Sequence, residues 1–122
     1  MLLGWGMDAF TESIERNNMA EYTPERWVVL EFVTPEETIQ KVFAGWYGGY
    51  LDGDSWKLNS GNTAERELDD RWEFDGYSGS TYVCHKSAYG MSVYMSSLLS
   101  GWSAQAEKEN ITINILDRYE SK

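Results

Sequence analysis

Cysteine, histidine and proline are scarce in this sequence, and each shortage excludes a class of structure or site. Of the 122 residues, one is cysteine, one is histidine and two are proline. Cys84 alone cannot form an internal disulfide, which favours a reducing, cytoplasmic location. His85 alone excludes sites that need two histidines. Because neighbours on a strand point to opposite faces, Cys84 and His85 also cannot work together as a nucleophile and its base.

Long apolar runs and a basic leader are missing as well. No stretch approaches the ~20 apolar residues of a membrane span, and Met1–Asp8 lacks the basic start and apolar run of a signal peptide. We expect a soluble protein with no membrane partner, folded as a single domain over residues 1–122 with loosely ordered ends at 1–6 and 118–122. The weakly patterned start leaves Met7 and Met19 open as alternative first residues.

Positive charge is in short supply. Ten Lys and Arg residues stand against twenty Asp and Glu, for a formal net charge of -10. Such a surface is repelled by phosphate backbones and anionic lipids and is attracted to basic grooves. We therefore expect no direct binding to nucleic acid and a basic protein surface as the partner. The simpler alternative is that the charge only keeps an aromatic-rich domain soluble.

Aromatic residues, in contrast, make up 15% of the chain and can supply a real core. Trp27–Val33 is β-branched and aromatic with only Glu31 polar, which predicts a central strand buried on both faces. Asp52-Gly53 predicts a turn between a strand over Ile39–Tyr50 and one that restarts at Trp56. Further strands are expected at Arg71–Asp75, Thr81–His85 and Ile111–Ile115, after an exposed connection over Asn59–Asp70.

Two segments have the pattern of helices. Apolar residues from Met91 to Ala106 recur at helical spacing, which predicts one long amphipathic helix over about 90–107 that covers a sheet face. Met7–Met19 has the pattern of a short N-terminal helix. The expected fold is α+β: an antiparallel meander sheet of about five strands, packed by the long C-terminal helix and the short N-terminal helix.

The strand expected over Ile39–Tyr50, which overlaps the glycine-rich segment Val42–Gly61, divides its apolar and aromatic side chains between two faces. One set is Val42, Ala44, Trp46 and Tyr50, expected in the core; the other is Ile39, Phe43 and Tyr47. If exposed, the second set is a protein-interaction hot spot or part of an aromatic platform. The alternative is burial of that set under a second layer, such as the N-terminal helix.

Carboxylates concentrate between Asp52 and Asp75, where eight acids stand against only Lys57, Arg66 and Arg71. Alternation along a strand puts Glu73 and Asp75 on one outward side. Such a face has the charge to imitate a phosphate ladder in a basic groove, whereas the alternative is a merely solvated edge. The expected partner-binding residues are Asp52, Asp54, Glu65, Glu67, Asp69, Asp70, Glu73, Asp75, Tyr47, Tyr50 and Trp56.

Signatures of chemistry are weak. Asp52-Gly-Asp54 begins like a calcium loop, but Lys57 and Thr63 occupy the positions that require glycine and a bidentate glutamate. Asp69-Asp70 is a candidate acid–base pair without a partner in a recognisable cleft. We expect no catalytic, metal-binding or cofactor-binding residues, and an enzyme built on a carboxylate pair is kept as a third hypothesis.

Three stretches, Ala44–Tyr50, Asp54–Gly61 and Tyr77–Lys86, resemble small phage- and prophage-encoded proteins without an assigned activity. The resemblance brings no catalytic residues. It implies an inhibitor of host defence, since small acidic phage proteins include DNA mimics that block restriction or CRISPR complexes. Our leading hypothesis is a non-enzymatic binding protein that occludes a basic host protein surface. The alternative is a small-ligand or carbohydrate-binding module that uses Trp46, Tyr47, Tyr50 and Trp56, and the oligomeric state, a homodimer included, is left open.

Overall fold

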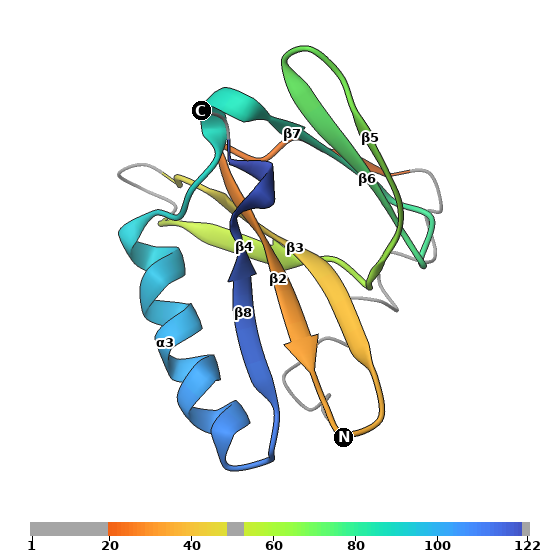
Figure 1. The fold of residues 1–122 in the computed structure, drawn as a ribbon. Helices are drawn as coiled ribbons and strands as arrows, with labels where there is room; N and C mark the ends of the chain where they lie inside the picture. Colours follow the sequence, from red (N-terminus) through yellow and green to blue (C-terminus); the bar gives the residue numbers. More distant parts are fainter. Residues whose placement is uncertain (1–19, 49–52, 121–122) are drawn as a thin grey trace.

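Two four-stranded sheets and one long helix make up the part of the chain that the structure, a computed structural model, describes: residues 20–48 and 53–120. The central sheet has the strand order β4-β3-β2-β8 and is antiparallel throughout. The outer sheet has the order β1-β7-β6-β5, with β1 parallel to β7 and the other pairs antiparallel. The helix, the central sheet and the outer sheet form three layers (Figure 1).

The strands are β1 Glu21–Tyr22, β2 Arg26–Val33, β3 Thr38–Trp46, β4 Ser55–Leu58, β5 Asn62–Glu67, β6 Arg71–Gly76, β7 Thr81–His85 and β8 Thr112–Leu116. The helix α3 spans Val93–Glu107, and two short 3-10 turns, η2 and η3, span Lys86–Ala88 and Asp117–Tyr119.

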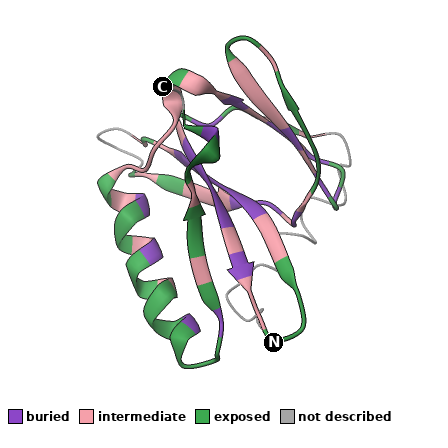
Figure 2. Ribbon diagram, in the orientation of Figure 1, coloured by how far each residue is buried: buried purple, intermediate pink, exposed green. Residues whose placement is uncertain are grey.

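β2 is buried on both faces, as its sequence predicts (Figure 2). Val28 and Leu30 face the core under α3, while Trp27 and Val29 face the core between the two sheets. The indole of Trp27 also donates a 2.7 Å hydrogen bond to the carbonyl of His85 in β7, so it ties the two sheets together. Alternation along one strand therefore supplies two separate cores.

α3 covers the central sheet, which confirms the predicted long helix. The side chain of Ser92 caps its start by accepting a 3.2 Å hydrogen bond from the amide of Met95. Met95 and Leu99 are buried, and the Trp102 ring packs against Phe43 and Trp56 at centroid distances of 5.0 and 4.8 Å. Apolar side chains spaced three and four residues apart thus hold α3 to the sheet.

The predicted single five-stranded meander is wrong, because the chain builds two sheets. The split occurs at Asn59, the buried residue that follows β4. Its side-chain oxygen accepts hydrogen bonds from the amides of Val42 (3.0 Å) and Gly61 (3.3 Å), and its amide nitrogen donates to Asn62 at 2.7 Å. Gly61, two residues further on, has φ +129, a backbone conformation that would be strained for a residue with a side chain. A glycine is therefore favoured where the chain leaves the central sheet.

Two local predictions also need correction, and one question that the sequence left open is decided. The expected exposed connection over 59–70 contains β5, the edge strand of the outer sheet. For Phe43 the alternative of burial under a second layer holds: it is fully buried, and α3 is that layer. At the C-terminal end, Tyr119 is buried at 1% exposure, although 118–122 was expected to be loose. The segments 1–6 and 7–19, where a loose end and a helix were expected, lie outside the described residues.

Candidate interaction surface

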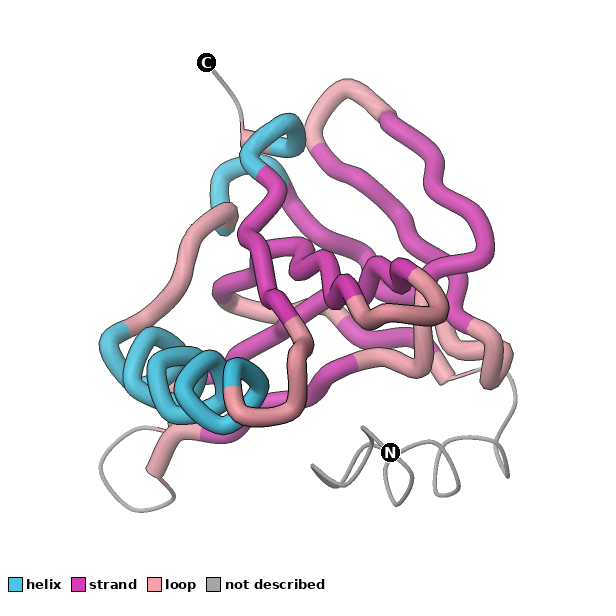
Figure 3. Tube along the Cα trace, turned by 60° about the horizontal axis from the view of Figure 1, so that its bottom comes forward, coloured by secondary structure: helices cyan, strands magenta, loops and turns pink. Residues whose placement is uncertain are grey.

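Six of the predicted carboxylates lie on one hairpin, β5–β6. The two strands pair antiparallel, with Arg66 opposite Glu73 and Ala64 opposite Asp75, after a bulge between Asn62 and Ala64. Alternation places Arg66, Glu73 and Asp75 on the outer face of the hairpin. Figures 1 and 3 show the hairpin at the end of the molecule opposite α3.

The outer face carries a continuous chain of ion pairs. Arg66 donates two hydrogen bonds to Asp75, at 2.9 and 3.0 Å, and one to Glu73 at 3.3 Å. Arg71 links Glu73 at 2.9 Å to Asp70 at 2.8 Å. Three carboxylates therefore share two guanidinium groups, which orient them and leave the chain of five groups negative.

The electrostatics of the hairpin keep these carboxyls ionised. A hydrogen bond from Arg66 lowers the pKa of Asp75 below its ordinary 3.8. Hydrogen bonds from Arg71 likewise lower the pKa of Glu73 and of Asp70. Because a charged donor favours the charged form of its acceptor, the three groups carry full negative charge at neutral pH.

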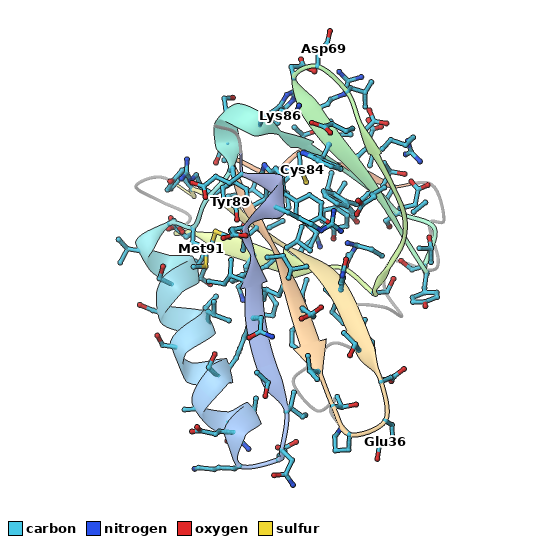
Figure 4. All side chains as sticks on the ribbon, in the orientation of Figure 1. Glu36, Asp69, Cys84, Lys86, Tyr89 and Met91 are labelled. Atoms are coloured by element: carbon cyan, nitrogen blue, oxygen red, sulfur yellow. The ribbon has the colours of Figure 1, made fainter. Side chains whose placement is uncertain are left out.

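An open pocket with a volume of about 500 Å³ lies on the inner side of the hairpin. Its lining consists of Glu67, Asp69, Trp72, Lys86, Arg118, Tyr119 and Glu120. Beside it, Glu65 accepts a 2.6 Å hydrogen bond from the Tyr119 hydroxyl and pairs with Arg118 at 3.2 Å. Lys86 forms an ion pair with Glu67 at 2.7 Å. Figure 4 labels Lys86 close to the hairpin whose tip carries Asp69.

Sequence reasoning missed the three partners Lys86, Arg118 and Tyr119. Arg118 and Tyr119 stand 53 and 54 residues from Glu65 along the chain. Only the packing of η3 against the outer sheet brings them together, and no local pattern signals it. Burial raises the pKa of Tyr119, and its hydrogen bond to Glu65 adds to that effect.

Asp54, one of the two remaining predicted acids, is not brought to this hairpin. Asp54 lies in the β3–β4 connection of the central sheet, where it accepts a 3.3 Å hydrogen bond from the amide of Gly48. Asp52 and Tyr50 lie outside the described residues. The predicted partner-binding set therefore divides between two regions, and its acidic part is concentrated on β5–β6.

The aromatic residues of the alternative hypothesis are also divided. Trp46 packs against the core between the sheets, and its indole donates a 3.1 Å hydrogen bond to the carbonyl of Thr23. Trp56 packs on the opposite face of the central sheet, against Phe43 and Trp102. Tyr47 is 53% exposed. The rings of Trp46 and Trp56 thus do not share one surface.

Groups that could support metal or thiol chemistry are not assembled in the described residues. Within residues 20–48 and 53–120, no three His, Cys, Asp or Glu side chains are placed to hold a metal ion. Cys84 is fully buried in the core between the sheets, and burial raises the pKa of its thiol. No helix in this part of the chain is long and apolar enough to cross a membrane.

No known protein family, curated protein or solved structure matches this chain. The chemistry of the surface itself is therefore the basis for assigning a function.

Proposed function

We propose that this chain is a non-enzymatic binding protein that docks the β5–β6 hairpin onto a basic protein surface. The partner is a nucleic-acid-binding host protein, and the chain inhibits it by occlusion, as the resemblance to phage proteins implies. The observation that carries the proposal is the concentration of charge: the hairpin has six carboxylates, Glu65, Glu67, Asp69, Asp70, Glu73 and Asp75, against Arg66 and Arg71.

The ion pairs of the hairpin favour recognition over mere solvation. Arg66 and Arg71 bridge Glu73, and this restricts the rotamers of the carboxylates before any partner arrives. Preorganised groups lose less conformational entropy on binding than mobile ones. Asp69 and Asp70 are exposed at the tip, where a lysine or arginine of a partner can reach them.

The net charge of -10 adds a long-range effect. A negative molecule is attracted to the positive groove of a nucleic-acid-binding protein, and this raises the association rate at low salt. Nucleic acid would compete for the same groove. The proposed mechanism is therefore competitive, reversible and sensitive to ionic strength.

The test is capture of a partner followed by competition. Tagged chain is incubated with host lysate at low and high salt, and the captured proteins are identified and purified. We expect a basic nucleic-acid-binding protein that is released by high salt, and we expect the purified chain to displace nucleic acid from it.

Two variants with the same change in net charge sharpen this test. Asp69→Lys/Asp70→Lys alters the tip of β5–β6, and Glu36→Lys/Glu37→Lys alters the exposed turn between β2 and β3. Figure 4 labels Asp69 and Glu36 at opposite ends of the molecule. Capture should be lost in the first variant and kept in the second. Equal capture by wild type and both variants would show that the hairpin is not the docking surface.

A further inference from the structure

The edge strand β8 and the exposed side of α3 are almost uncharged, although the chain has a net charge of -10. β8 has the sequence Thr-Ile-Asn-Ile-Leu and ends the central sheet. The exposed positions of α3 include a single charged residue, Glu107. The other exposed positions of α3 are Val93, Ser96, Ser97, Ser100, Gly101, Ser103, Ala104 and Gln105. Exposed faces of surface helices are ordinarily charged, so this composition is unusual.

Each of the other edge strands in the described part of the chain has a feature that discourages pairing with another strand. β5 carries Glu65, Arg66 and Glu67 and begins at a bulge. β4 carries Lys57, and β1 has only two residues. Charges, bulges and short length are the usual protections of a sheet edge. β8 has five residues, none of them charged, glycine or proline.

The outer edge of β8 also has few hydrogen-bond partners. Besides its ladder with β2, its backbone receives one hydrogen bond from the described residues, a 3.1 Å bond from the Tyr89 hydroxyl to the carbonyl of Leu116. The outward amides and carbonyls of the strand before Leu116 are available to another strand. Ile115 is 45% exposed beside them.

We infer that β8 pairs antiparallel with β8 of a second copy of this chain, about a two-fold axis at Asn114. This register places Ile113 opposite the partner's Ile115, and Thr112 opposite the partner's Leu116. Ile113 packs against the core under α3 and lines a groove of 260 Å³ between α3 and β8. The exposed Ile115 of each copy is thereby covered beside an isoleucine of the other, and two four-stranded sheets become continuous.

The distribution of charge favours a second copy of this chain as the partner that pairs with β8. Two molecules that are each strongly negative repel one another except where their facing surfaces carry few charges. The β8 edge is such a surface, and its sequence is complementary to itself under a two-fold axis. The acidic hairpin lies on the outer sheet, so the dimer leaves it exposed for a partner.

Sedimentation velocity over a concentration series, at low and high salt, tests this inference with three forms of the full chain. Wild type should form a dimer, with twice the 14.0 kDa mass of the chain. High salt should leave the dimer intact or strengthen it, because salt screens the repulsion between the two copies. Ile115→Lys should weaken dimerisation at least about tenfold, since it places ammonium groups at the seam. Tyr77→Lys, at a 71% exposed site in the turn between β6 and β7, should leave dimerisation unchanged.

Hydrogen exchange gives a second readout that does not depend on a variant. The amides of 112–116 in the wild type should become more protected as protein concentration rises, while those of β5 should not. A wild type that stays monomeric throughout the series would overturn the inference. So would a dimer that Ile115→Lys does not weaken, or one whose β8 amides exchange at a concentration-independent rate.

Discussion

At the scale of single residues, Asn59 decides where one sheet ends and the other begins. It is 2% exposed, and its side-chain oxygen satisfies two backbone amides, those of Val42 and Gly61. The ammonium group of Lys41 donates a 3.1 Å hydrogen bond to its carbonyl. Asparagine alone among residues of this size offers both a planar acceptor and a donor. Both are used here, at the crossing where the chain passes from the central sheet to the outer sheet.

Asn59→Ala should lower the free energy of unfolding by about 2–4 kcal/mol, because it leaves two buried amides without an acceptor. Urea titration measures the loss. Thr63→Ala is the comparison, since it removes one exposed hydrogen bond to the carbonyl of Asp75 and should cost less than about 1 kcal/mol. A loss at Asn59 no larger than that at Thr63 would show that the crossing does not depend on this side chain.

Cys84 should be inert in the folded protein. Its side chain is fully buried and burial raises the pKa of its thiol, so both access and thiolate formation are suppressed. A thiol-reactive dye should label it only as fast as the protein unfolds, and urea should accelerate labelling. Ser96→Cys adds a thiol at an exposed position of α3 and should give an immediate extra phase. Rapid labelling of the wild type under native conditions would contradict the described core.

Asp75 gives the stability a defined pH dependence. Its pKa in the folded protein lies below the ordinary 3.8, chiefly because Arg66 donates hydrogen bonds to it. Its contribution is therefore present above about pH 4 and is lost as the pH falls through the folded-state pKa. Asp75→Asn should be less stable than wild type at neutral pH, and the difference should shrink in acid. Unfolding curves that stay equally separated from pH 7 to the acid limit would contradict this.

At the scale of elements, sequence patterns predicted β2 and α3 well because each has a distinct periodicity. β2 reads as a nearly continuous apolar run, and α3 repeats its apolar residues at helical spacing. β5 gave no such signal: Thr63, Ala64, Glu65 and Arg66 are all exposed, so no alternation between buried and exposed positions marks the strand. Its pairing with β6 holds it in place, and that interaction is not local.

Gly101 should be replaceable within α3. A Cβ at this position meets no atom within 4 Å. Gly101→Ala should therefore raise the free energy of unfolding by about 0.5–1 kcal/mol, the usual gain in helix propensity. Ala104→Gly, at another exposed position of the same helix, should lower it by a similar amount. Denaturant titration at one protein concentration compares the two, and a loss of stability for Gly101→Ala would show that this side of the helix is packed.

At the scale of the whole molecule, the sequence could not predict the division into two sheets. The division depends on contacts far apart in the chain, such as the bond from Trp27 to His85, 58 residues away, and the one from Tyr119 to Glu65. The acidic concentration, in contrast, follows from composition. The structure adds the arrangement of these carboxylates. Arg66 and Arg71 link three of them into one chain of ion pairs. Arg118 in η3 forms an ion pair with Glu65, and Lys86 forms one with Glu67.

The measurement that tests the proposed function most directly is the dissociation constant of the purified partner as a function of salt. It compares wild type with Asp69→Lys/Asp70→Lys and Glu36→Lys/Glu37→Lys, which change the net charge equally at different ends of the molecule. Docking through β5–β6 predicts that the first variant binds at least about tenfold more weakly and with a smaller salt dependence, while the second stays close to wild type. Equal weakening of both variants would mean that only net charge matters, and it would contradict a docking surface on the hairpin.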